Sequence, residues 1–97
     1  MVAVKSNGYA LEFIDDPSEE MKIEAIQSTN GHAIQFIVDP SEKLQILAVG
    51  FDGAAISGIY DPSEEVQIEA VKSSSEAIDY IYEPTKKVKA LARKLWN

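Results

Sequence analysis

Hydrophobic residues recur at intervals of three and four positions in four short blocks, each of which follows a proline. The blocks share their apolar positions: Met21, Leu44, Val66 and Val88 stand near the start, and Ala25, Ala48, Ala70 and Ala92 follow four residues later. This spacing places apolar side chains along one face of an α-helix. The blocks therefore predict four helices of about eleven residues.

A proline and its neighbours mark the start of each predicted helix. The prolines are Pro17, Pro40, Pro62 and Pro84, at separations of 23, 22 and 22 residues. Three of them belong to the sequence Asp-Pro-Ser-Glu, and the last belongs to Glu-Pro-Thr-Lys. An Asp side chain can accept a hydrogen bond from the first helical turn, where the missing N–H of proline costs nothing. We therefore expect the acidic residue to cap each helix.

A second marker lies ten residues before three of the prolines: Asn7-Gly8, Asn30-Gly31 and Asp52-Gly53. Such pairs supply the left-handed backbone that ends a helix, so a shorter helix of about two turns is expected after each glycine. A β-hairpin is the alternative for Asn-Gly, but it needs alternating apolar and polar flanks, which the sequence lacks. The fourth unit has Ser73-Ser74-Ser75-Glu76 instead, which reads as a capping box.

The two markers divide the chain into four repeats, approximately residues 7–29, 30–51, 52–73 and 74–97. The preceding segment Ala3–Ser6 repeats Ala70–Ser73 and forms an N-terminal half-repeat. Each helix pair has more apolar surface than it can bury alone, so adjacent units must stack. The sequence thus predicts an all-α fold: a short α-solenoid of four two-helix repeats plus the half-repeat, in a single domain over residues 1–97.

The repeated pattern Asn-Gly-x-Ala-x-x-(Phe/Tyr)-Ile-x-(Asp/Glu)-Pro-Ser-Glu-Glu-x-x-Ile-x-Ala resembles short tandem repeats of bacterial and bacteriophage proteins of unknown function. These repeats have two helices in about 22 residues; the pattern is more loosely similar to leucine-rich-repeat-variant and HEAT-like α-solenoids. The resemblance covers Ala3 to Lys94. It implies a right-handed stack of helices used for binding, and no catalytic residues.

One irregularity interrupts the repeat. Gly58 stands where other units carry an aromatic residue, namely Phe13, Phe36 and Tyr80. Phe51 stands where other units carry Ser28 and Ser73. We therefore expect Phe51 to fill the volume that Gly58 leaves.

Composition excludes several classes of function. Sixteen acidic against nine basic residues give a net charge of −7, which disfavours direct binding to nucleic acid or to an anionic membrane. The chain has no cysteine and one histidine, so thiol and most imidazole chemistry is excluded. With no secretory signal and no apolar run long enough to span a membrane, we expect a cytoplasmic protein.

Each candidate catalytic residue lacks the partner groups that catalysis would need. His32 has no second imidazole or thiol partner, and the adjacent carboxylates of Glu19-Glu20 and Glu64-Glu65 point in different directions around a helix. Ser73-Ser74-Ser75 lacks a base that would activate a hydroxyl. We therefore expect neither an enzyme nor a cofactor or metal site.

Stacked repeats would align their acidic residues at steps of about 10 Å. The resulting strip of acidic residues has two interpretations. It is either a solvated edge formed by helix N-termini, or it binds a protein partner with a basic surface. By analogy with small acidic phage proteins, that partner would be a host nucleic-acid-binding or defence protein whose basic groove is occupied, as by an anti-CRISPR-like DNA mimic. The candidate contact residues are Asp16, Glu19, Glu20, Asp39, Glu42, Asp61, Glu64 and Glu65, with Tyr9, His32, Tyr60 and Tyr82 beside them.

The last repeat reverses the charge. Five basic residues and no acid follow Pro84, whereas residues 1–83 carry four lysines against sixteen acids, a net −12. The basic helix either closes the stack as a polar cap or mediates self-association, head-to-tail or in a symmetric oligomer. The candidate self-association residues are Lys86, Lys87, Lys89, Arg93, Lys94 and Trp96.

Overall fold

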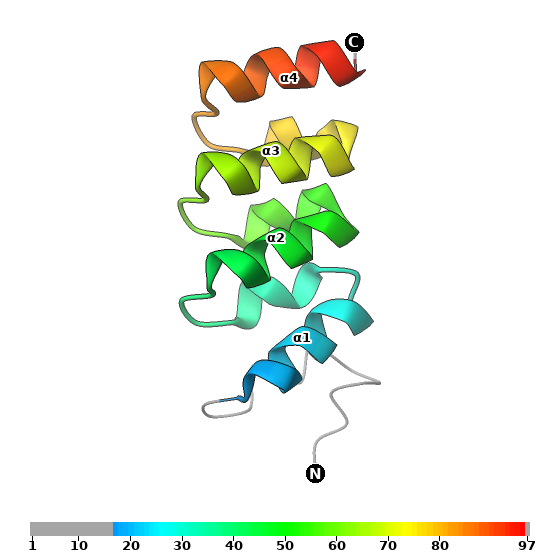
Figure 1. The fold of residues 1–97 in the computed structure, drawn as a ribbon, viewed down its shortest axis with the longest axis vertical. Helices are drawn as coiled ribbons and strands as arrows, with labels where there is room; N and C mark the ends of the chain where they lie inside the picture. Colours follow the sequence, from blue (N-terminus) through cyan, green and yellow to red (C-terminus); the bar gives the residue numbers. More distant parts are fainter. Residues whose placement is uncertain (1–16, 97) are drawn as a thin grey trace.

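The computed structural model describes residues 17–96, and these residues form helices and no strands (Figure 1). The predicted all-α fold is confirmed. The elements are α1 (Glu19–Ser28), η2 (His32–Phe36), α2 (Glu42–Phe51), η3 (Gly53–Gly58), α3 (Glu64–Ser73), η4 (Ser75–Tyr80) and α4 (Lys86–Trp96), where η denotes a 3₁₀-helix.

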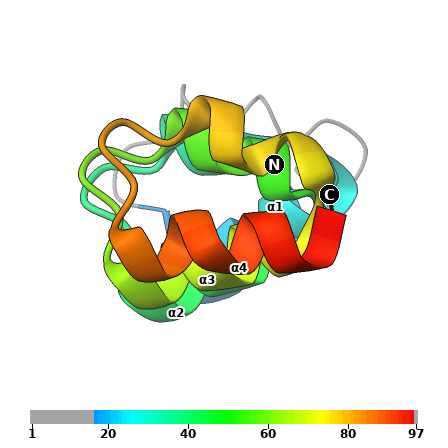
Figure 2. The same ribbon diagram turned by 90° about the horizontal axis from the view of Figure 1, so that it is seen from above.

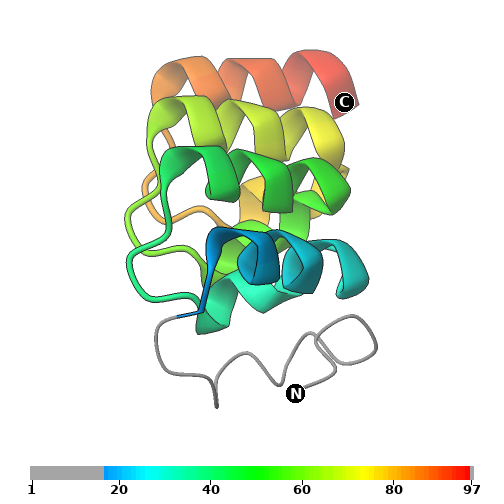
Figure 3. The same cartoon turned by 60° about the horizontal axis from the view of Figure 1, so that its bottom comes forward.

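The α-helices lie one above another in one layer, and the 3₁₀-helices form a second layer behind them (Figures 1 and 2). Each element contacts its neighbours in its own layer, and adjacent elements of the two layers also contact one another. The α-helices all begin at the same edge of the stack and end at the opposite edge (Figure 3). This arrangement places equivalent residues of successive units side by side.

The helices start two residues later than predicted. Ser18, Ser41 and Ser63 are the N-cap residues, and each hydroxyl accepts a hydrogen bond from the backbone N–H three residues on, at 3.2–3.3 Å. The predicted acidic caps are therefore wrong at the described repeats. Asp39, Asp61 and Glu83 instead adopt left-handed backbone angles, with φ of 49°, 50° and 53°, and turn the chain from one layer into the other.

The shorter helices are of the 3₁₀ type, with five or six residues each. Their backbone bonds join residues three apart, as in Ile37 N–H to the Ile34 carbonyl at 3.1 Å. At about three residues per turn, this agrees with the predicted two turns. The tight geometry projects the alanine and isoleucine of each segment into the space between the layers, where Ala33, Ile34 and Ile37 are all buried.

The predicted left-handed ending is confirmed after α1, where Asn30 and Gly31 have φ of 56° and 95°. After α2 it is wrong: Asp52 is extended, with φ of −156°, and caps η3 by accepting a hydrogen bond from Ala54 N–H. The capping box predicted at Ser73–Glu76 is also wrong. The hydroxyl of Ser74 makes no local cap and accepts a hydrogen bond from Gly53 N–H, 2.8 Å away in the preceding unit.

Glycine is required at two positions where the layers touch, Gly31 and Gly53. A Cβ atom at Gly31 would collide with the carbonyl oxygen of Ala48, and one at Gly53 with the carbonyl oxygen of Ala70. Both alanines are completely buried. The glycine of each of these units therefore packs its backbone directly against the α-helix of the same unit.

The predicted core is largely confirmed. Its buried aliphatic residues recur at the same positions in successive units: Ala33, Ala55 and Ala77; Ile34 and Ile56; Ile37, Ile59 and Ile81; Leu44, Val66 and Val88; Ala25, Ala48, Ala70 and Ala92; and Ile26, Val49 and Val71. One predicted row lies at the margin, since Ile23, Ile46 and Ile68 are partly buried and Ala90 is exposed.

The expected compensation between Phe51 and Gly58 is wrong. The position of a Cβ on Gly58 lies 2.8 Å from the Cβ of Gln35, so no empty volume remains there. Phe51 is 42% exposed at the end of α2. Gly58 is thus needed for a close approach of η3 to η2.

Two glycine variants test the layer contact. Gly53→Ala should lower the free energy of unfolding by about 1–3 kcal/mol, because the new methyl group meets a backbone oxygen that cannot move aside. Gly50→Ala, which has open space around its Cβ in α2, should raise the same free energy by about 0.5–1 kcal/mol. Urea denaturation followed by circular dichroism measures both. Equal effects of the two substitutions would contradict the proposed packing role of Gly53.

Candidate functional site

Acidic residues gather at the edge of the stack where the α-helices begin. Glu19, Glu20, Glu42, Glu64 and Glu65 occupy the first turns of α1, α2 and α3, and all are exposed. The exposed loop residues Asp39 and Asp61 precede α2 and α3. We call these seven residues the acidic edge. Acidic side chains are favoured here because the helix dipole is positive at its N-terminus.

The carboxylates of the acidic edge remain available for a partner. Among residues 17–96 no ion pair joins them to a described cation. The contacts between acidic and basic side chains there include His32–Asp52 and Lys72–Glu69. One polar contact connects two units, since the Ser63 hydroxyl donates to Glu42 Oε2 at 2.6 Å. The edge ends at α4, whose first-turn residues are Lys86 and Lys87. The predicted members Asp16 and Tyr9 lie outside the described residues.

Of the predicted aromatic contact residues, Tyr60 and Tyr82 lie at the acidic edge and His32 does not. The two tyrosines are in the loops before α3 and α4, and their side chains are 97% and 88% exposed. Val38 holds the equivalent place before α2 and is 89% exposed. His32 begins η2 just beyond the end of α1, at the opposite edge (Figure 1).

His32 belongs to a polar network that links three units. Its Nε2 lies 3.1 Å from Asp52 Oδ2, while Asp52 Oδ1 accepts hydrogen bonds from Ala54 N–H at 3.0 Å and from the Ser74 hydroxyl at 3.3 Å. The hydrogen bond from Ala54 N–H, followed by that from His32, lowers the pKa of Asp52 below its ordinary value of 3.8, although desolvation opposes the shift. The network therefore stabilises the ionised carboxylate.

The Asp52 carboxylate should make stability depend on pH. Because its pKa is lower in the folded than in the unfolded chain, ionised Asp52 adds stability above pH 4, and this contribution is lost as the pH falls through the folded value. The difference in free energy of unfolding between wild type and Asp52→Asn should thus be larger at pH 6 than at pH 2.5. Asp79→Asn, which removes an exposed carboxylate from η4, is the matched control. An equal pH dependence of the two variants would contradict the role of the network.

A cavity of about 620 Å³ opens between the loops of the third and fourth units. Its inner wall includes the buried residues Ile56, Ile59 and Gln67. Three tyrosines, Tyr60, Tyr80 and Tyr82, and the carboxylates of Asp61 and Glu83 also line it. Sequence reasoning missed Gln67 and placed Tyr80 only in an aromatic row. The sequence did hold one signal that could have pointed to Gln67: a glutamine stands at the same helical position in two units, as Gln45 and Gln67.

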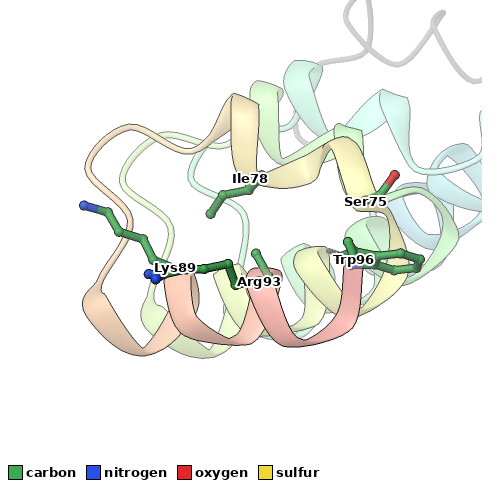
Figure 4. A pocket seen from close by; sticks show the side chains of 6 residues that line it. Ser75, Ile78, Lys89, Arg93 and Trp96 are labelled. Atoms are coloured by element: carbon green, nitrogen blue, oxygen red, sulfur yellow. The ribbon is translucent and has the colours of Figure 1, made fainter.

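A second, shallower cavity of about 360 Å³ lies on the C-terminal end of the stack, between η4 and α4 (Figure 4). Ser75 replaces the glycine of the layer contact there, and its partner Ala92 is 9% exposed, unlike the fully buried Ala48 and Ala70. Lys89 and Arg93 occupy the places of Gln67 and Val71, which are buried in α3. The end face therefore carries charge where an interior unit would be covered.

The remaining predicted self-association residues are also on α4. Trp96 donates from Nε1 to the Val71 carbonyl at 2.6 Å, so it attaches the end of α4 to α3. Lys86, Lys87 and Lys94 are exposed, and the latter two line a groove of about 520 Å³ between α3 and α4. The structure thus places the six residues on α4 but not in one cluster.

Residues 17–96 contain neither a metal-binding cluster nor a membrane-spanning helix. No group of three or more His, Cys, Asp or Glu side chains there is placed to hold a metal ion. No helix in this part of the chain has the length and apolar character needed to cross a membrane. Comparison of the sequence with protein families, with curated proteins and with solved structures finds no match in any of the three.

Proposed function

We propose that this chain is a short α-solenoid that acts as a non-catalytic binding module, and that its acidic edge binds a protein with a basic surface. The repeated units support the first part, because equivalent residues recur in register along the stack. The carboxylates that face solvent without a described cationic partner support the second part.

The observation that carries the proposal is the exposure of apolar side chains beside these carboxylates. Helix N-termini favour acids in any protein, so the charge alone does not distinguish a binding surface from a solvated edge. Val38, Tyr60 and Tyr82 nevertheless leave nearly their whole side chains in water at the same edge. Tyrosine is enriched at the centres of protein interfaces, where its ring is buried and its hydroxyl is hydrogen-bonded.

The spacing of the charges suggests the kind of basic surface. Carboxylates that recur with each stacked helix, at steps of about 10 Å, place negative charge along a line, as a phosphate backbone does. A groove that normally binds nucleic acid would accept such a line. In its specific form, the proposal is that the chain is a phage-type inhibitor. It would occupy the basic groove of a host nucleic-acid-binding or defence protein.

Charge-neutral variants test the acidic edge. The triple variant Glu19→Gln, Glu42→Gln, Glu64→Gln should lose the basic proteins that the wild-type chain retains from a bacterial lysate, because it removes carboxylates from three successive helices. Quantitative mass spectrometry of the retained proteins, at two salt concentrations, measures this loss.

The matched control removes the same charge elsewhere. Glu69→Gln, Glu76→Gln, Asp79→Asn takes three acids from α3 and η4 outside the acidic edge and should leave the retained proteins unchanged. Loss of the same proteins from both triple variants would assign binding to net charge alone. Retention of all of them by the first variant would discard the acidic edge as the binding surface.

Self-association is a second candidate, favoured by the groove between α3 and α4. Its walls combine Ile68, Leu91 and Leu95 with Lys72, Lys87 and Lys94, so an acidic and partly apolar segment of a second copy would fit it. The acidic edge with its exposed tyrosines has this character.

Light scattering separates the two candidates. For the partner-binding module we expect a mass of 10.7 kDa at all salt concentrations, because the end face carries Lys89 and Arg93 where stacking needs apolar residues. A larger species at low salt that dissociates at high salt would instead support self-association. Lys87→Glu, Lys94→Glu should then abolish that species.

A further inference from the structure

The cavity between the third and fourth units is built from two equivalent loops. Tyr60 and Tyr82 occupy the same place in successive repeats, as do Asp61 and Glu83. No basic side chain is among the residues that line it. The cavity therefore combines aromatic rings with negative charge, which are the two features that attract an organic cation.

Gln67 adds an unsatisfied acceptor to this cavity. Its side chain is 7% exposed, and its Nε2 donates to the Pro62 carbonyl at 3.1 Å. Its Oε1 is buried and accepts no hydrogen bond within the described part of the chain. Buried amide oxygens without a donor are uncommon in folded proteins. The equivalent Gln45 makes the same bond to Pro40 but is only partly buried, so water can reach it.

We propose that this cavity binds an arginine side chain of the protein partner. The inference rests on the proposed function, since it names the group that the acidic edge would recognise. A guanidinium is planar, stacks on tyrosine rings and carries five N–H donors in a fixed fork. One donor would reach Gln67 Oε1 and others the carboxylates of Asp61 and Glu83.

The geometry favours arginine over the other cationic side chain. A lysine ammonium is compact and strongly hydrated, so it gains less from a cavity walled by rings and cannot stack. Gln67 Oε1 has almost no exposed surface, so the carboxamide must rotate about its last torsion, which exchanges the bond from Nε2 to the Pro62 carbonyl for one from the guanidinium to Oε1. That torsion is broad and has no steep barrier.

The test uses the full chain and three peptide probes: hexa-arginine, hexalysine and hexacitrulline. Titrations followed by nuclear magnetic resonance should give a Kd for hexa-arginine about fivefold lower than for hexalysine, and no saturable binding of hexacitrulline. Bound hexa-arginine should shift the side-chain amide resonances of Gln67. Equal affinity for the arginine and lysine peptides, or binding of the neutral citrulline peptide as strong as that of arginine, would overturn the proposal.

Two variants separate the cavity from the acidic edge. Tyr60→Ala, Tyr82→Ala changes side chains that are almost fully exposed, so the fold should be retained, and the preference for arginine should disappear while hexalysine binding is unchanged. Glu19→Gln, Glu42→Gln should weaken both peptides by the same factor and leave the preference intact. Phe51→Ala, at the end of α2 and outside both the cavity and the acidic edge, is the matched control and should change neither.

The possible failures are distinguishable. If the tyrosine variant keeps its preference for arginine while the glutamate variant weakens both peptides, the acidic edge binds cations and the cavity proposal is wrong. If the tyrosine variant loses the preference and the glutamate variant has no effect, the cavity proposal stands and the acidic edge fails. If neither cationic peptide binds the wild-type chain, both proposals are wrong.

Discussion

The two helical layers meet backbone against backbone at Gly31 and Gly53. The glycine at the start of η2 or η3 lies against the carbonyl oxygen of an alanine in the α-helix of the same unit. A side chain on the glycine would meet this oxygen and push the layers apart, so the contact limits the space between them. The isoleucines of the 3₁₀-helices and the small aliphatic residues of the α-helices are sized for the narrow gap that remains, and most are fully buried.

The last unit shows what happens when this contact is relaxed. Ser75 brings a Cβ to the position of the glycine, and the face of η4 and α4 beyond it is covered by no further described unit. Ile78 is then only partly buried, whereas Ile34 and Ile56 are buried completely. Lys89 and Arg93 keep their charges in water at positions that are buried in α3. The fourth unit therefore exposes charged side chains at positions that are covered in the third.

Periodicity was sufficient to predict the helical class, the approximate helix lengths and nearly all buried positions, because a spacing of three and four residues reflects a single local geometry. It could not decide between the two polar residues on either side of the proline at a helix start, and the serine rather than the aspartate is the cap. It also missed contacts between units: Ser74 bonds to Gly53 and His32 to Asp52 across 21 and 20 residues. For the candidate site, the exposed tyrosines and acids were predictable, whereas the burial of Gln67 depends on how the fourth unit covers the third.

The cavity between successive loops has a consequence for how such a chain could diversify. Part of its wall comes from exposed residues that stand 22 positions apart, Tyr60 with Tyr82 and Asp61 with Glu83. Duplication of one unit would therefore copy one of the two loops that line this cavity. Substitution of a residue in either loop would alter its wall. In such a scaffold, the residues of two successive loops would set the chemistry of the cavity. They could change largely without affecting how the core folds.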